Sequence, residues 1–343
     1  NWIMCIEYLN DKPLKIIKRD IEEIPTLLEP IFPKVGTVAM AGTSDIGKST
    51  ILRQFAISVS MGDTEFFGWK LNTTHQRVLV VSTEDFEDSL TINLKRFNRT
   101  RPRDAKDYSN INFITDIEDI IPTIENHVRD NPIDLLVLDA YLDIYSGTNA
   151  KNDGGQVRQF LTKYDQLANK YGFLAIWNHH TKKGSQAFAP DKDNVLGSQS
   201  FEAKMRLVCL VRPDLVEDNR RHLCFVKGNY LPPEHKNESY VIEHDENMYF
   251  KATGEREVFE NLRVEVKAKE DLKKSAISLF EEGMSYKEIE VKLKSDGHKL
   301  SKSSVGRWLK KHKEDRIKLG FLSSDIQKKH SVVYFLKTVL MNY

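Results

Sequence analysis

The chain has 343 residues, 40% of them hydrophobic and 29% charged, which is typical of a globular protein large enough for two domains. No apolar run approaches the roughly 18 residues of a membrane span, and the three cysteines lack paired metal spacing, so we expect a cytoplasmic protein without membrane contact. Residues 261–343 carry 19 Lys and Arg against 11 Asp and Glu, a net charge of +8, whereas the rest carries 32 against 39, a net charge of −7. A basic tail on an acidic body indicates a nucleic-acid-binding appendage, with a merely solvated surface as the alternative.

Short apolar runs alternate with helical patterns from residue 35 onward. The run VGTVAM at 35–40 predicts a strand, and a Gly-rich turn and a helix over 49–60 follow it. These strands are continuously apolar, which is typical of a parallel sheet covered by helices on both faces. The predicted fold class is therefore α/β. We expect further strands over 77–83, 111–115, 134–139, 172–178, 207–211 and 222–226, and a helix over 155–171.

Changes in composition divide the chain into four parts. An N-terminal segment (1–24) precedes the α/β domain (25–255), and a charged stretch (256–271) is predicted to be a linker. A small helical domain is expected over 272–343.

The stretch GTSDIGKST at 42–50, here called the phosphate loop, fits the pattern G-x-x-x-x-G-K-[ST] between a predicted strand and a predicted helix. The two glycines allow a tight loop whose N–H groups point inward, and the helix N-terminus adds positive potential for phosphate oxygens. Lys48 should reach the β- and γ-phosphates of a nucleotide, and the Ser49 hydroxyl should hold Mg²⁺. The predicted nucleotide-binding residues are Gly42, Thr43, Ser44, Asp45, Ile46, Gly47, Lys48, Ser49 and Thr50.

Two carboxylates follow apolar strands. Asp139 closes DLLVLD and is the expected second ligand of Mg²⁺ beside Ser49. Ala140 follows it, so the group that activates water must come from elsewhere. Glu84, at the end of RVLVVST, is the predicted general base or water-orienting residue, unless it only caps a turn.

Polar residues also close the fifth predicted strand, which ends in Asn178, His179 and His180. The carboxyl ends of parallel strands face the ligand crevice. We expect one histidine, His179 ahead of His180, to contact the γ-phosphate, with a purely structural histidine as the alternative. A metal site is disfavoured because no Cys or carboxylate with ligand spacing accompanies the pair.

The segments GTSDIGKST, VVSTED, LLVLD and WNHHTKK, in that order, resemble the RecA-like ATPase core, most closely that of plasmid RepA and DnaB-type hexameric helicases. The resemblance covers roughly residues 25–250. It implies a RecA-like parallel sheet flanked by helices, ATP with Mg²⁺ as ligands, and a homo-oligomer, of hexamer type, with ATP sites between subunits. By this likeness Glu84 matches the catalytic glutamate and His179 the γ-phosphate sensor.

The same resemblance places a DNA-facing central loop at 182–200, with Lys182 and Lys183 as DNA-binding candidates; a plain loop is the alternative. It also implies that basic residues of a neighbouring subunit complete each ATP site, for which Arg206 and Lys227 are candidates. Where the family pattern has an arginine two residues after the lysine, this chain has Asn229, which makes Arg206 the better arginine candidate.

The C-terminal part resembles a helix-turn-helix domain. Helices are predicted over 272–282, 285–295 and 301–313, and the segments 320–324 and 331–337 could form a two-stranded wing. The third helix should bury Val305, Trp308 and Leu309 on one face. Its other face offers the DNA-binding candidates Lys302, Arg307, Lys310 and Lys311. A winged helix that docks a protein or covers the ATPase is the alternative.

These patterns lead to one function and two rivals. The leading interpretation is an ATP-dependent DNA helicase or translocase of a mobile element, a ring that moves on single-stranded DNA and binds duplex DNA through its C-terminal domain. The first rival is a RecA-like ATPase used as a nucleotide-switched DNA-binding regulator or defence protein without unwinding activity. The second, a non-enzymatic origin-binding protein, is disfavoured because Gly47, Lys48, Ser49, Glu84 and Asp139 are all present.

Overall fold

The computed structural model describes residues 23–85, 87–102, 108–116, 118–145, 153–197, 199–296, 305–306, 308–310 and 312. The chain divides into two compact units, Asn1–Arg263 and Val264–Tyr343. The stretch expected to be a linker, 256–271, has regular structure instead. It contains the end of strand β13 (Phe250–Val258), a 3₁₀ turn (Phe259–Leu262) and the start of helix α8 (Val264–Glu281).

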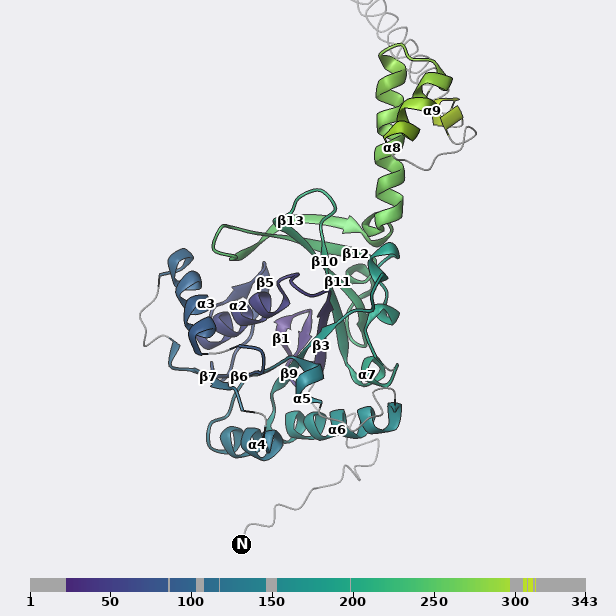
Figure 1. Ribbon diagram of the computed structural model, residues 1–343. Coiled ribbons are helices and arrows are strands. Elements are labelled where there is room, and N and C mark those ends of the chain that lie inside the picture. Colours follow the sequence, from purple (N-terminus) through teal and green to yellow (C-terminus); the bar gives the residue numbers. More distant parts are fainter. Residues whose placement is uncertain are drawn as a thin grey trace, which may run out of the picture. The chain divides into compact units, whose positions relative to one another are not determined.

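In the described part of the chain, nine strands form one sheet in the order β13-β12-β11-β10-β3-β9-β8-β6-β7 (Figure 1). The strands from β10 to β7 pair in parallel, and those from β10 to β13 pair antiparallel. The predicted α/β fold with a mostly parallel, RecA-like sheet is confirmed. Besides β13, the strands are β3 (Gly36–Gly42), β6 (Val78–Ser82), β7 (Ile111–Ile114), β8 (Leu135–Asp139), β9 (Leu174–His180), β10 (Leu207–Pro213), β11 (Arg220–Gly228) and β12 (Glu238–His244).

Alternating side chains of the parallel strands build two cores, one on each face of the sheet. On one face, Val38 and Ile176 join a buried cluster with Phe55 of helix α2 (Lys48–Ser60). On the other, Trp177 joins a cluster with Tyr164 of helix α6 (Gly154–Tyr171). Figure 1 shows α4 and α6 together on one side of the strands and α2 on the other. The remaining helices of this unit are α3 (Glu87–Thr100), α4 (Ile120–Asp130), α5 (Tyr141–Ile144) and α7 (Gln199–Lys204).

A second, small sheet was not predicted. Its strands β1 (Thr26–Glu29), β2 (Phe32–Pro33), β4 (Glu65–Phe66) and β5 (Trp69–Leu71) follow the order β2-β1-β5-β4. Phe55 of α2 contacts the rings of Phe32 and Phe66, with centroids 5.7 and 5.0 Å away. This sheet therefore packs on the outer side of the helix that follows the phosphate loop.

The C-terminal unit contains α8 and α9 (Tyr286–Ser295). Ser285 and Glu288 form a reciprocal capping box at the start of α9, as their spacing predicts. The predicted core residues Val305 and Leu309 are buried, and Trp308 packs against their cluster. Lys310 is exposed, whereas Lys302, Arg307, Lys311 and the expected wing lie outside the described residues, so the helix-turn-helix and its DNA contacts stay predictions.

Across the described residues, no helix combines the length and the apolar character that a bilayer crossing requires.

Candidate nucleotide site

The phosphate loop joins the end of β3 to the start of α2, as its pattern predicts. Gly47 adopts a left-handed conformation with φ 97°, and a Cβ there would lie 3.1 Å from the ring of Phe250. A Cβ on Gly42 would lie 2.8 Å from the carbonyl oxygen of Val211. Both glycines are therefore required by close approach of neighbouring atoms, and the loop is held against β10 and β13.

Lys48 opens helix α2 and is only 5% exposed. Its Nζ donates to the carbonyl oxygen of Thr43 at 2.7 Å, across the phosphate loop. Burial lowers the pKa of Lys48, and the charges of Asp139, Glu84 and Asp45 act in the opposite direction. The nearby carboxylates thus favour a charged ammonium group at the loop, where it can neutralise phosphate oxygens.

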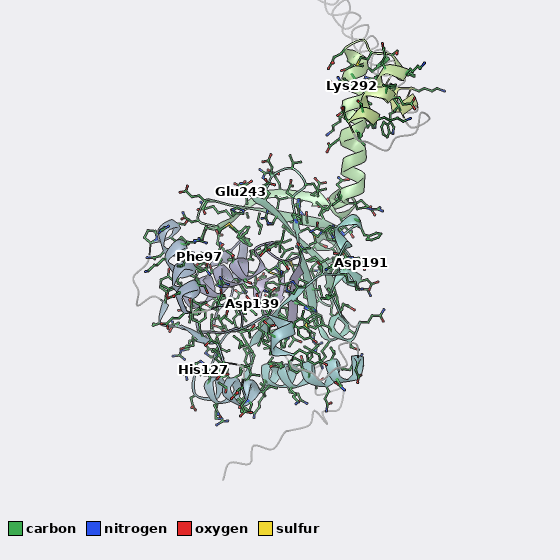
Figure 2. All side chains as sticks on the ribbon, in the orientation of Figure 1. Phe97, His127, Asp139, Asp191, Glu243 and Lys292 are labelled. Carbon is green, nitrogen blue, oxygen red and sulfur yellow. The ribbon has the colours of Figure 1, made fainter. Side chains whose placement is uncertain are left out.

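Ser49 and Asp139 are brought together by a residue to which the sequence assigned no role. Asn178, on β9 between β3 and β8, donates through Nδ2 to Ser49 Oγ at 3.1 Å and to Asp139 Oδ1. Figure 2 labels Asp139 within the sheet region of this unit. The signal available in the sequence was a polar residue at the carboxyl end of an otherwise apolar strand.

The residues present fit Mg²⁺. A hydroxyl and a carboxylate are hard oxygen ligands, and Mg²⁺ commonly takes one or two such protein groups together with substrate phosphates. The buried Oδ1 of Asn178, beside both groups, has no hydrogen-bond partner among the described residues, which is consistent with a further polar ligand at this point. The same residues contain no cluster of three or more His, Cys, Asp or Glu for an all-protein metal site.

Glu84 follows β6 and is exposed. Partial burial of its carboxylate, and the charges of Asp139 and Asp143, raise its pKa above the ordinary value, whereas Lys48 acts to lower it. The strand end that carries Glu84 is tied to the end of β8, because Thr83 Oγ1 donates to Asp143 Oδ2 at 2.8 Å. A carboxylate with a raised pKa is suited to accept a proton from water.

The structure changes the expected assignment of the two histidines. His179 is 1% exposed, lies between the rings of Tyr141 and Phe201, and hydrogen-bonds through Nε2 to the carbonyl oxygen of Leu196 at 2.9 Å. It belongs to the sheet face opposite α2. His180 alternates to the α2 face, is half-buried, and pairs in register with Gly42. The histidine placed at the phosphate loop is therefore His180, because a one-residue step along a strand reverses the face.

Arg206 and Lys227 lie far from the phosphate loop of their own chain. Leu207 pairs with both Val38 and Gly228, whereas Gly42 pairs with Val211, so these residues are about 13 Å further back along the strands. Lys227 forms an ion pair with Glu202 at 2.9 Å. The Arg206 guanidinium has no ion-pair or hydrogen-bond partner within the described part of the chain, and Arg206 lines a pocket of about 680 Å³.

The loop after β9 lies against the phosphate loop. Its residues Lys182 and Lys183 are exposed, as is Phe188. Gln186 Nε2 donates to Thr43 Oγ1 of the phosphate loop at 3.3 Å. The expected DNA-facing loop is therefore in direct contact with the candidate nucleotide site.

Comparisons with known proteins agree with this geometry. A family model described as an AAA domain matches residues 9–186. Among solved structures, the ATPase domain of a DnaB-like helicase matches with a TM-score of 0.50 and 14% sequence identity, covering 69% of this chain and 95% of that chain. No protein of curated function matches the sequence. With its phosphate loop, its mostly parallel sheet and a family model that spans more than half of its length, the chain belongs to the AAA domain family of P-loop ATPases.

Proposed function

We propose that this protein is an ATP-dependent DNA translocase or helicase of the RepA and DnaB-like type, which hydrolyses ATP at interfaces between its subunits. The observation that carries the proposal is the convergence of Lys48, Ser49, Asp139 and Glu84 at one edge of the sheet, while the unpaired Arg206 lies at the other. Such a site lacks a cation for the γ-phosphate that a neighbour's opposite edge can supply. A head-to-tail ring follows naturally from this arrangement.

Each residue then has a defined part in hydrolysis. The phosphate loop and Lys48 bind the terminal phosphates, and Ser49 and Asp139 hold Mg²⁺, which when bound neutralises phosphate charge. Glu84 orients a water molecule and accepts its proton as the water oxygen bonds to the γ-phosphorus and the bond to the β–γ bridging oxygen breaks. Arg206 of a neighbour balances the charge that develops on the transferred group, and His180 contacts it from the β9 side.

The coupling to DNA is proposed to run through residues 182–196. Gln186 links this loop to Thr43, and its backbone is held by Arg212, so a change at the phosphate loop is transmitted to a rigid segment. The exposed Lys182 and Lys183 supply charge for a DNA backbone, and exposed Phe188 supplies an aromatic face for a base.

The test is the ATP hydrolysis rate of the wild type and of Glu84→Gln, each measured alone, with single-stranded DNA and with duplex DNA. We expect stimulation by single strands in the wild type and a loss of about 100-fold or more in the variant, because a catalytic proton acceptor contributes about 10²–10⁴-fold. A low rate indifferent to single strands would instead favour a nucleotide-switched DNA-binding regulator. Full activity in Glu84→Gln would remove Glu84 from the mechanism.

A further inference from the structure

Asp85, the neighbour of Glu84, is held by three side chains from three elements. Its Oδ2 accepts hydrogen bonds from Arg53 Nη2 of α2 at 2.6 Å and from Ser82 Oγ of β6 at 3.0 Å. Its Oδ1 accepts a third from Ser89 Oγ of α3 at 3.0 Å. The side chains of Arg53 and Asp85 are only 11% and 16% exposed. This adjacent carboxylate is therefore fixed in place through both of its oxygens.

Glu84 differs from Asp85 in every one of these respects. It is exposed, and within the described residues its carboxylate takes part in no hydrogen bond or ion pair. A group that must receive a proton from water benefits from such freedom, but its position then depends on the backbone that carries it. Because Asp85 is the next residue along the turn, its three partners determine where the Glu84 backbone lies.

The ion pair also joins the two halves of the proposed site. Arg53 lies five residues after Lys48 on the same helix, α2, which also carries Ser49. The turn after β6 carries Glu84. A charge-assisted bond between poorly exposed groups is shorter and stronger than a neutral one, so it fixes the distance between helix and turn.

We propose that Arg53 and Asp85 are positioning residues that hold Glu84 at the correct distance from the phosphate loop during hydrolysis. The inference rests on the proposed ATPase function and concerns how its catalytic carboxylate is placed. Stability alone is a weak explanation for the pair, because a poorly exposed ion pair often contributes little net folding free energy. Its location, one residue from Glu84 and on the phosphate-loop helix, points to geometry instead.

The test compares Arg53→Gln, Arg53→Lys and Asp85→Asn with a matched control pair. Asp63 and Arg101 form a similar ion pair, with distances of 2.7 and 2.8 Å, just beyond the ends of α2 and α3. Breaking it with Arg101→Gln disturbs the same two helices without touching the turn of Glu84. For each full-length variant, kcat, KM, the melting temperature and the affinity for a fluorescent ATP analogue with Mg²⁺ are measured.

We expect kcat to fall about 10- to 100-fold in Arg53→Gln and Asp85→Asn, as for a misplacement of about 1 Å. KM and analogue affinity should stay within about threefold, because Lys48 and the phosphate loop are unchanged. Arg53→Lys, which keeps a cation, should fall less than Arg53→Gln. Arg101→Gln should keep kcat within about twofold, even at a comparable loss in melting temperature.

The outcomes separate this inference from the function on which it rests. Loss of activity in Glu84→Gln together with wild-type kcat in Asp85→Asn would overturn the positioning role alone. Parallel losses of kcat and analogue affinity, or an equal loss of kcat in Arg101→Gln, would also overturn it, because the pair would then only support the fold. Full activity in Glu84→Gln would instead contradict the proposed mechanism itself.

Discussion

At the scale of single residues, the site depends on which face of a strand each side chain occupies. Asn178 and His180 lie on the α2 face of β9, and His179 between them lies on the other. His179 donates from Nε2 to the Leu196 carbonyl, since a carbonyl oxygen can only accept, and the buried Nδ1 has no partner in the described residues. A second proton on this ring would therefore have no acceptor.

This environment predicts an acid-sensitive contribution to stability. Burial lowers the pKa of His179 to about 4, whereas an unfolded histidine has a pKa of about 6.5. Between these values the unfolded state binds more protons, so stability is complete above pH 6.5 and is lost as pH falls toward 4. The loss is up to about 3 kcal/mol, at about 1.4 kcal/mol per tenfold change in proton affinity.

The measurement is urea unfolding at pH 7, 5.5 and 4.5 for the wild type and His179→Gln. The glutamine amide can still donate to Leu196 but does not titrate, so the variant should lose less stability on acidification. His75→Gln, at an exposed position, is the control and should follow the wild type. Identical pH dependence in wild type and His179→Gln would show that this histidine does not contribute.

Most residue types of the site could be predicted from sequence, but their partners could not. The pattern in 42–50 specified the phosphate loop, because only glycine permits its close contacts. The choice between His179 and His180 depended on the last residues of a strand, where a shift of one position reverses the face. The roles of Asn178 and Arg53 depended on side chains distant in sequence, 39 residues away for Asp139 and 32 for Asp85.

At the scale of elements, the parallel strands were predicted because they are continuously apolar, and the others were missed for physical reasons. Strand β13 has mostly exposed residues and lies at the sheet edge, so its charged sequence resembled the start of a linker. The strands of the small sheet are two to four residues long, too short to show a period. Antiparallel edges therefore escape a search for buried runs.

The loop after β9 is held by a buried cation at the element scale. Arg212 of β10 is 3% exposed and donates to the carbonyl oxygens of Ser185, Gln186, Phe188 and Leu262. Among the described residues, no carboxylate pairs with it. The guanidinium therefore satisfies several backbone acceptors at once, which neither lysine nor an apolar residue can reproduce.

Replacing Arg212 by methionine should lower the free energy of unfolding by about 2–4 kcal/mol, because unpaired buried carbonyls cost about 1–3 kcal/mol each. Urea denaturation measures this directly. Arg220→Met is the control, since Arg220 makes half-exposed ion pairs with Glu243 and Glu255 that contribute about 0–1 kcal/mol. Equal losses in the two variants would contradict the special role of Arg212.

At the scale of the whole molecule, the account depends on an ATP site shared between copies of the chain. The nucleotide-binding groups lie at one edge of the parallel strands and Arg206 at the other. A single chain cannot bring them together, because about 13 Å of strand separates them. The basic C-terminal unit, carrying the net charge of +8 over residues 261–343, is then an appendage repeated around the assembly.

The most direct test of the shared site mixes two inactive variants. Glu84→Gln keeps Arg206, and Arg206→Ala keeps Glu84, so a mixed assembly contains interfaces in which both residues are intact. The account predicts low ATP hydrolysis for each variant alone and a rise of several-fold on mixing at equal concentration, with no rise when either variant is mixed with Lys48→Ala/Glu84→Gln/Arg206→Ala triple-variant chains. A mixture that hydrolyses ATP only at the average rate of its two components, or an Arg206→Ala variant that is fully active alone, would contradict the shared site.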